Sequence, residues 1–160
     1  MSQELDISFF ARKAADVARD LVGRTLVRPR GQGYTRVVIT EVAAHEGGSP
    51  IAARRGMTYA PGRIFVMPHR GRVFLNIATD HEGMASCVFM RSGIVVGERR
   101  EVVDGPIKLA NRLAITRALD GQPLGSTLWV EGDSVNSALI EESIPDVSAA
   151  NCTGIFKLRV

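Results

Sequence analysis

The sequence lacks several features that would place it in a specialised class of protein. No run of 18 apolar residues occurs, which argues against a helix that spans a membrane. The first residues, Met1-Ser2-Gln3-Glu4-Leu5-Asp6, have neither the basic nor the apolar region of a secretory signal, so we expect a cytoplasmic protein. Internal repeats and low-complexity segments are also absent. A chain of 160 residues is long enough for one domain with its own core.

Cysteine is scarce. The two cysteines, Cys87 and Cys152, lie far apart in the sequence, and neither belongs to a CxxC or Cys/His pattern that would bind a metal ion. Both have apolar neighbours, as small buried thiols in a reducing compartment usually do. We therefore predict two free cysteines and no metal or other cofactor.

The apolar pattern predicts a mixed α/β fold of the α+β type, a single domain over residues 1–160 with a mostly antiparallel sheet and flanking helices. One helix is expected over residues 8–22, with Ser8 as its N-cap and Gly23 as its stop. A second is expected from Pro106 to Ala114, capped by Asp104. A long loop is expected over residues 43–62. Strands are expected at 25–27, 35–42, 64–67, 72–78, 85–90 (with 94–100 as a candidate extension), 128–131 and 155–160.

Three polar residues stand where apolar strands are expected to end. Glu41 interrupts the run from Val37 to Val42, and a carboxylate buried there without a partner would hold a proton more strongly, as a general base near neutral pH must. The alternative is that Glu41 turns to solvent. Asn76 and Arg91 hold similar positions, with a turn cap and a surface ion pair as their alternatives. No lysine is expected in this group, which argues against a Schiff-base step.

Basic residues gather in one stretch of the chain. The formal net charge is only +3 and the pI about 9.2, but residues 54–72 include no acidic residue. A DNA backbone would favour such a stretch, and a solvated loop is the alternative. The basic residues of this stretch are Arg54, Arg55, Arg63, His69, Arg70 and Arg72.

Several segments together resemble the 3-methyladenine DNA glycosylase family of the alkyladenine type. They keep the family's order and similar spacing apart from a shortened middle: Phe9-Phe10, residues 18–27, residues 37–41, Leu75-Asn76-Ile77, Met90-Arg91-Ser92 and residues 105–109. The resemblance implies that Glu41 activates the water that attacks the sugar C1′ and that Arg91 helps to hold this water. It also implies that Asn76 lines the base pocket and disfavours guanine.

The sequence departs from the family at the residues that would hold a flipped base. The family's Glu-Ala-Tyr is Glu41-Val42-Ala43 here, so the stacking Tyr is missing, and the pocket His falls at Ala52. The family's Tyr that inserts into the duplex, as a wedge in the space of the flipped base, falls near Arg70. Candidate replacements are Phe65 or Met67 as pocket walls, His45 as a polar contact, and His69 or Arg70 as the wedge. The alternatives are core positions for Phe65 and Met67 and a solvated His45.

The remaining candidates concern DNA. Arg55, Arg70 and Arg72 would contact the backbone, and Lys108 follows a Gly105-Pro106 helix start that is similar to a family segment. A simple helix start is the alternative for Lys108. The hypothesis is a monomeric, monofunctional DNA glycosylase whose partner is double-stranded DNA with a damaged base. Its alternatives are a DNA-binding module that has lost catalysis and a nucleoside hydrolase.

Overall fold

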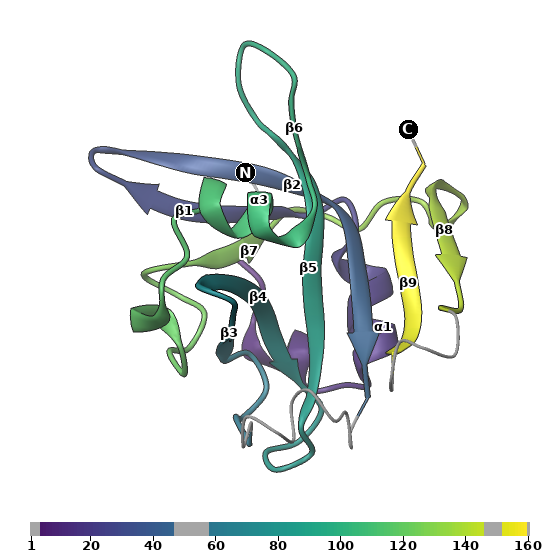
Figure 1. Cartoon of the computed structure of the whole chain (residues 1–160). Helices are drawn as coiled ribbons and strands as arrows, with labels where there is room; N and C mark the ends of the chain where they lie inside the picture. Colours follow the sequence, from purple (N-terminus) through teal and green to yellow (C-terminus); the bar gives the residue numbers. More distant parts are fainter. Residues whose placement is uncertain (1–3, 47–57, 146–151, 160) are drawn as a thin grey trace.

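The computed structural model describes residues 4–46, 58–145 and 152–159, which form one nine-stranded sheet with helices packed on it (Figure 1). The strands are β1 (Thr25–Arg30), β2 (Gly33–His45), β3 (Ile64–His69), β4 (Arg72–Thr79), β5 (Ser86–Val95), β6 (Glu101–Asp104), β7 (Trp129–Glu131), β8 (Ile140–Ser143) and β9 (Cys152–Leu158). The helices are η1 (Ile7–Phe10), α1 (Ala14–Leu21), α3 (Pro106–Arg112), η2 (Arg117–Leu119) and η3 (Ser137–Leu139). The predicted α+β class is confirmed.

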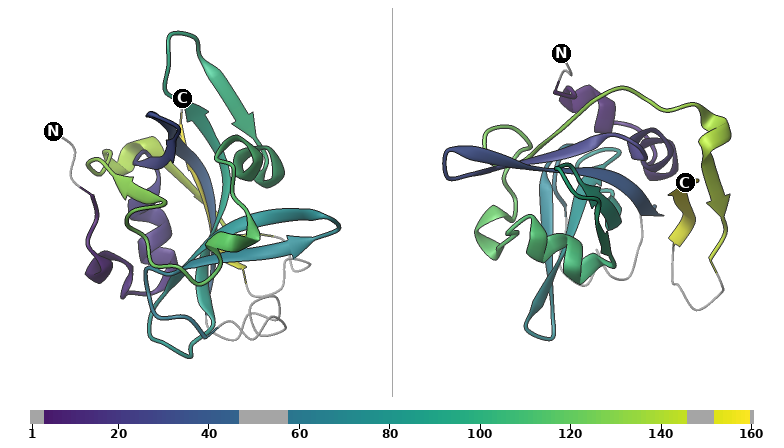
Figure 2. Two further views of the ribbon diagram at one scale, coloured as in Figure 1. Left: turned by 90° about the vertical axis from the view of Figure 1, so that its left-hand side faces the viewer. Right: turned by 90° about the horizontal axis from the view of Figure 1, so that it is seen from above.

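The strand β2 organises the sheet. All pairings between the named strands are antiparallel, and the main order is β3-β4-β5-β2-β1-β7. One edge of β2 pairs with β5, while its other edge pairs first with β1 and then with β9. Figures 1 and 2 show α1 and α3 on different sides of this long strand. Because β2 is 13 residues long, it links both halves of the sheet.

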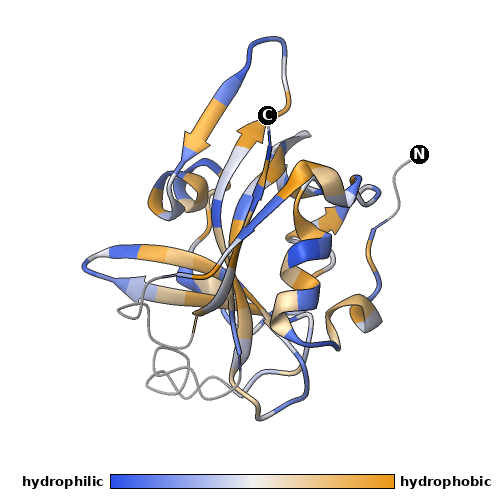
Figure 3. Cartoon of the chain, turned by 90° about the vertical axis from the view of Figure 1, so that its right-hand side faces the viewer, coloured by the Kyte–Doolittle hydropathy of each residue, from blue (hydrophilic) through white to orange (hydrophobic). Residues whose placement is uncertain are grey.

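Burial follows the alternation that a strand imposes. Val42 and Ala44 of β2, Leu75 and Ile77 of β4, and Met90 of β5 join side chains of α1 and α3 in one hydrophobic core. Figure 3 shows apolar and polar residues mixed along the strands and α1, as expected for elements with one buried side. No helix within the described ranges is long and apolar enough to cross a membrane. The residues between those in the core lie on the other face of β2, β4 and β5, which the next subsection describes.

The first predicted helix is two helices. Asp6, not Ser8, caps η1, because its carboxylate accepts a hydrogen bond from the Ile7 amide at 2.8 Å. The chain then turns before α1, whose first two amides, of Ala14 and Ala15, donate to the Glu46 carboxylate at 3.3 and 3.0 Å. A cap supplied from the end of β2 could not be predicted from local sequence. The stop at Gly23 is confirmed by its positive φ of 90°.

Other boundaries differ where partner strands extend an element. β2 continues through His45, so residues 43–45 are not a loop, and residues 47–57 of the predicted loop lie outside the described part of the chain. β5 runs to Val95 and turns back as β6, which was not predicted; β8 was also missed. Gly105, not Asp104, is the N-cap of α3, because the Asp104 carboxylate accepts from the Ser92 hydroxyl at 3.2 Å.

The two cysteines are free but differ in environment. Cys87 is 3% exposed, and burial raises the pKa of its thiol to about 12. Cys152 is only half-buried, so the prediction of a buried thiol was right for Cys87 and wrong for Cys152.

Candidate active site

Two β-bulges mark the middle of the sheet. Ile39 of β2 pairs with Gly93 of β5, and Val42 pairs with Met90, but Glu41 between them pairs with Ser92. Thr40 is therefore the extra residue on β2, and Arg91 is the extra residue on β5. Bulges re-aim side chains and are common beside active sites. Here the register before and after the two bulges is the same, so only the central residues are displaced.

Two cations lie beside Glu41. Arg91 Nε lies 2.6 Å from Glu41 Oε2, and Lys157 Nζ of β9 lies 3.2 Å from Glu41 Oε1. The Glu41 side chain is 13% exposed, against 36% for Arg91 and 56% for Lys157. The Arg91 Nε–H does not point at a hydrogen-bond acceptor in the described residues, so its contact with Glu41 is an ion pair and not an aligned hydrogen bond. Each carboxylate oxygen thus faces one cation.

Glu41 remains open to solvent on one side. It borders a recess of about 230 Å³ whose lining includes Lys157 of β9, Ser92 of β5 and Asp104 of β6. The Ser92 hydroxyl is held between Asp104 and the Gly105 amide, which donates to it at 3.1 Å. A carboxylate that is mostly buried but reaches a recess can contact a water molecule and a substrate.

The base-pocket candidates share one face of the sheet. Side chains directly opposite each other in neighbouring strands lie on the same face. Phe65 pairs with Asn76, Asn76 with Phe89, and Phe89 with Ala43, which makes one row across β3, β4, β5 and β2. We call the face that carries this row the site face. A second row on it contains Met67 opposite Phe74 and Glu41 opposite Lys157; a third contains Ala78, Cys87, His45 and Cys152.

Two aromatic residues on the site face were missed by the sequence analysis. The rings of His69 and Phe74 stack at 5.1 Å between centroids and 22° between planes. The ring centroids of Phe74 and Phe89 lie 5.2 Å apart, and those of Phe89 and His45 lie 6.2 Å apart. The Arg91 guanidinium lies 6.0 Å from the Phe89 ring centroid. Because residues i and i+2 of a strand share a face, Phe74 before Asn76 and Phe89 before Arg91 could have been found from the sequence.

Asn76 is fixed by its neighbours in the sheet. It is 4% exposed, its Nδ2 donates to the Phe65 carbonyl at 3.4 Å, and its Oδ1 accepts a weak hydrogen bond from the Cys87 thiol at 3.7 Å. The raised pKa of Cys87 keeps this thiol protonated, so it stays a donor. Phe65 packs with Ala78 and Cys87 in a small cluster apart from the main core, with Met67 at its margin. Phe65 and Asn76 are therefore packed residues of the site face itself.

His45 is buried, which corrects the alternative of a solvated side chain. It is 9% exposed, and burial, with a smaller effect of the Arg91 charge, lowers its pKa. Its Nδ1 has no hydrogen-bond partner in the described part of the chain. A neutral imidazole at this place is a polar contact that carries no charge.

The structure corrects two expectations about strand ends. Glu41, Asn76 and Arg91 lie inside their strands, not at the ends, because β2, β4 and β5 each continue past them. The group also contains a lysine, Lys157, which reaches Glu41 from β9. The alternating pattern of residues 155–160 predicted a half-buried strand, but the partner of that strand was not predictable from it.

The β3–β4 hairpin carries basic residues at its tip. Arg70 and Gly71 both have positive φ, of 49° and 76°, as a two-residue type I′ turn requires. His69, Arg70 and Arg72 are exposed, and none of the ion pairs between described residues includes Arg70 or Arg72. The tip therefore presents cations that are free to bind phosphate.

The other DNA candidates are less well placed. Lys108 is exposed in the first turn of α3, but the Gly105 amide at the start of that helix already donates to Ser92, which favours the interpretation as a simple helix start. Arg55 lies outside the described residues. Across the described ranges, no group of three or more His, Cys, Asp or Glu side chains could hold a metal ion.

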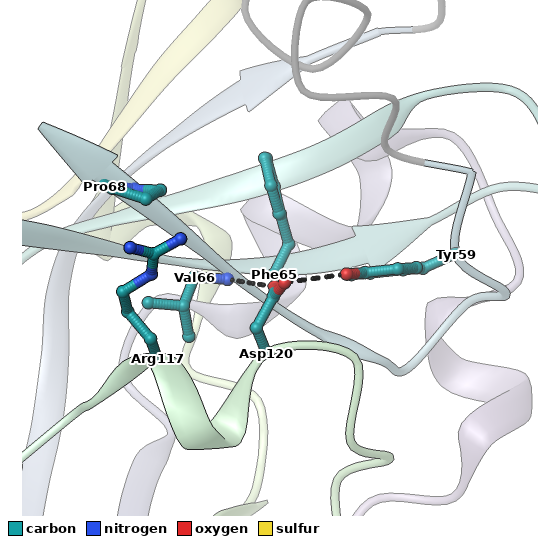
Figure 4. A pocket seen from close by; sticks show the side chains of 6 residues that line it. All are labelled: Tyr59, Phe65, Val66, Pro68, Arg117 and Asp120. Atoms are coloured by element: carbon teal, nitrogen blue, oxygen red, sulfur yellow. Dashed lines mark hydrogen bonds between the residues drawn. The ribbon is translucent and has the colours of Figure 1, made fainter.

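A separate pocket of about 280 Å³ lies along β3, away from Glu41 (Figure 4). Asp120 accepts hydrogen bonds there from the Tyr59 hydroxyl at 2.8 Å and from the Val66 amide at 2.9 Å. Partial burial, helped by Asp120, raises the pKa of Tyr59. Both Asp120 oxygens are used to satisfy an amide of the edge strand β3 and to hold Tyr59, which is a structural role.

Comparison with known proteins gives one consistent family. The family model described as methylpurine-DNA glycosylase matches residues 8–148. A protein of Streptomyces avermitilis, provisionally named a 3-methyladenine DNA glycosylase, is 37% identical over 136 residues, which cover 71% of this chain and 64% of that protein. A protein of Methanocella arvoryzae with the same provisional name is 34% identical over 148 residues, 77% of this chain and 74% of its own length.

The human DNA-3-methyladenine glycosylase is 31% identical over 186 residues, which cover 94% of this chain and 60% of the human protein. The chain thus spans less than two thirds of the length of the Streptomyces and human relatives. Lys157 lies beyond the part that the family model matches. The match over residues 8–148 and the fold agree, and the chain belongs to the methylpurine-DNA glycosylase family.

Proposed function

We propose that this protein hydrolyses the N-glycosidic bond of alkylated or deaminated purines in double-stranded DNA, as a step of base excision repair. The observation that carries the proposal is the Glu41 carboxylate, which is mostly buried, flanked by two cations and in contact with a recess, on the same face of the sheet as Phe74 and Phe89. Membership of the family supports the same substrate class.

Glu41 is the proposed general base. Cleavage of an N-glycosidic bond passes through an oxocarbenium-like state, which a nearby carboxylate stabilises while it takes a proton from the attacking water. Arg91 holds the carboxylate in place through the 2.6 Å ion pair. General-base catalysis contributes about 10²–10⁴-fold in rate, so the loss of this group should be easy to measure.

The site face provides the proposed base pocket. The target base must leave the helical stack to reach Glu41, which costs a few kcal/mol. Phe89 and Phe74 can stack on a flipped base, with Met67 beside them, while buried Asn76 and His45 offer polar contacts. The fixed Asn76 amide is the proposed discriminator against guanine. Phe65 supports Asn76, its partner across β3 and β4, from the small cluster with Ala78 and Cys87.

The hairpin tip is the proposed contact with the duplex. Arg70 or His69 would enter the space that the flipped base leaves, and Arg72 would bind a neighbouring phosphate. Lys108 and Arg55 are proposed as further backbone contacts. One copy of the chain contains all of these groups, which is consistent with action as a monomer.

Hydrolysis without a lyase step remains the proposal although a lysine is present. A lysine must be neutral to attack the sugar C1′. Lys157 forms an ion pair with the Glu41 carboxylate at 3.2 Å. An amine held in this ion pair is not available as a nucleophile.

The test is base release from duplexes that contain hypoxanthine, ethenoadenine or 3-methyladenine, with Glu41→Gln alongside. We expect release by the unmodified protein and a loss of at least a hundredfold in the variant, which keeps the size of the side chain but not its charge. Salt-dependent DNA binding without release would favour the binding module. Hydrolysis of free nucleosides with weak DNA affinity would favour the nucleoside hydrolase.

A further inference from the structure

We propose that Lys157 is a positioning residue for the Glu41 carboxylate, which it holds from β9 while Arg91 holds it from β5. This inference rests on the proposed role of Glu41. It adds a residue from outside the part of the chain that the family model matches.

The register of the sheet places Lys157 beside Glu41. Glu41 is the first residue of β2 to pair with β9, and its partner there is Lys157. Because Cβ atoms of directly opposite residues lie about 5 Å apart, a lysine at this position can reach the carboxylate without leaving the sheet. The observed distance of 3.2 Å between Nζ and Oε1 agrees with this.

Lys157 has a choice of two carboxylates. Its other neighbour across the sheet is Glu141 of β8, which is exposed. The ammonium nevertheless pairs with Glu41, whose side chain is 13% exposed. A less solvated carboxylate attracts a cation more strongly, because water screens it less. The charges alternate across four strands, in the order Arg91, Glu41, Lys157 and Glu141.

The two cations act on different oxygens, and this limits how the carboxylate can rotate. With Oε2 facing Arg91 and Oε1 facing Lys157, the group is held from two sides. A third charged residue, Asp104, lines the same recess as Glu41 and Lys157.

The proposal predicts a specific change in the concentration profile of single-turnover base release from a hypoxanthine duplex. Lys157→Met should lower the plateau rate constant, which reports chemistry at Glu41, and leave the half-saturating protein concentration unchanged. Since more than half of the Lys157 side chain is exposed, we expect a loss of about tenfold, less than the roughly hundredfold that a misplaced group can cost. Lys157→Arg should keep the wild-type plateau. Lys13→Met, in a lysine just before α1, is the matched control and should also leave it unchanged.

A measurement without DNA tests the contact itself. Urea unfolding of the wild type, Glu41→Gln, Lys157→Met and the double variant forms a double-mutant cycle. We expect Lys157→Met to lower the urea midpoint less when residue 41 is Gln. Additive effects in this cycle, or profiles of Lys157→Met and wild type that coincide, would overturn the positioning role.

The two proposals fail in different ways. Base release that persists in Glu41→Gln removes the role of Glu41 in the reaction, and with it the positioning role of Lys157, even if the double-mutant cycle shows the contact. Release that depends on Glu41 but not on Lys157 leaves the proposed function intact and overturns only the inference. Trapping of Lys157 on an abasic duplex by borohydride would make it a nucleophile and likewise overturn positioning.

Discussion

Phe89 of β5 lies directly opposite Ala43 of β2 on the site face. The family that the sequence resembles has a stacking Tyr where this sequence has Ala43, and we propose that the ring of Phe89 on the next strand takes its place. We therefore expect Phe89→Leu to reduce base release roughly five- to a hundredfold, since base–aromatic stacking is worth about 1–3 kcal/mol. Phe89→Tyr, which keeps the ring, should retain most activity.

The control for Phe89 is an aromatic residue away from the site face. Tyr34, 56% exposed, packs against Trp129 near the β1–β2 turn. Tyr34→Leu should leave base release unchanged under single-turnover conditions. Equal rates for Phe89→Leu and the wild type would show that Phe89 is not a stacking surface.

The hairpin tip gives a prediction about DNA distortion. Arg70 has a positive φ, which Asn tolerates well, so Arg70→Asn removes the long cation without straining the turn. We expect slower base flipping, measured with 2-aminopurine fluorescence beside the lesion, and little change in the urea midpoint. Arg72→Asn should instead weaken binding to any duplex and lower the slope of log K against log salt by about 1. An Arg70→Asn variant that flips the base at the wild-type rate would exclude Arg70 as the wedge.

From the burial of His45 we predict that the free energy of unfolding depends on pH in the acidic range. Burial lowers its pKa in the folded state below the ordinary value of 6.5, so the unfolded chain binds a proton first as the pH falls. Stability from this group is therefore complete above about pH 6.5 and is lost progressively below it. His45→Gln should show a smaller fall in urea midpoint between pH 7 and 5 than the wild type. Parallel curves for the two proteins would contradict the burial of a neutral His45.

From the burial of Cys87 we predict that the free energy of unfolding falls as the pH rises in the alkaline range. Its pKa is raised from 9.0 to about 12 by burial, so the unfolded thiol ionises first as the pH rises above 9. The contribution to the free energy of unfolding is present below pH 9 and is lost as the pH rises toward 12. Cys87→Ala should flatten this alkaline loss. Thiol reagents at pH 8 should modify half-buried Cys152 well before Cys87, and equal rates would contradict the observed burial.

Local patterns predicted much of the sheet. The apolar runs over residues 37–42 and 85–90 identified β2 and β5, and the resemblance identified Glu41, Asn76 and Arg91, which the structure brings to one face. The bulges were not predictable, since a residue is extra only relative to a partner strand. Lys157 was missed for the same reason, because the carboxylate that it meets depends on where β9 pairs.

The N-terminal region shows the same limit. The spacing of Val17, Ala18 and Leu21 correctly predicted the buried side of α1, but its start depends on Glu46, which lies after β2. The sequence indicates Ser8 as the cap because it shows only which residues are neighbours along the chain. Contacts between distant segments, and not propensities, therefore determined where the predictions were wrong.

The pair of bulges makes the active-site candidates depend on each other. Deletion of Thr40 alone would slide one part of β2 against β5 by one residue, and every side chain beyond it would turn to the opposite face of the sheet. A matching deletion of Arg91 would restore the register but remove the cation. β2 and β5 would then pair in a regular antiparallel register without bulges and without the site. The proposed catalytic site in this architecture thus depends on an insertion of two residues that an ordinary antiparallel sheet can gain or lose as a unit.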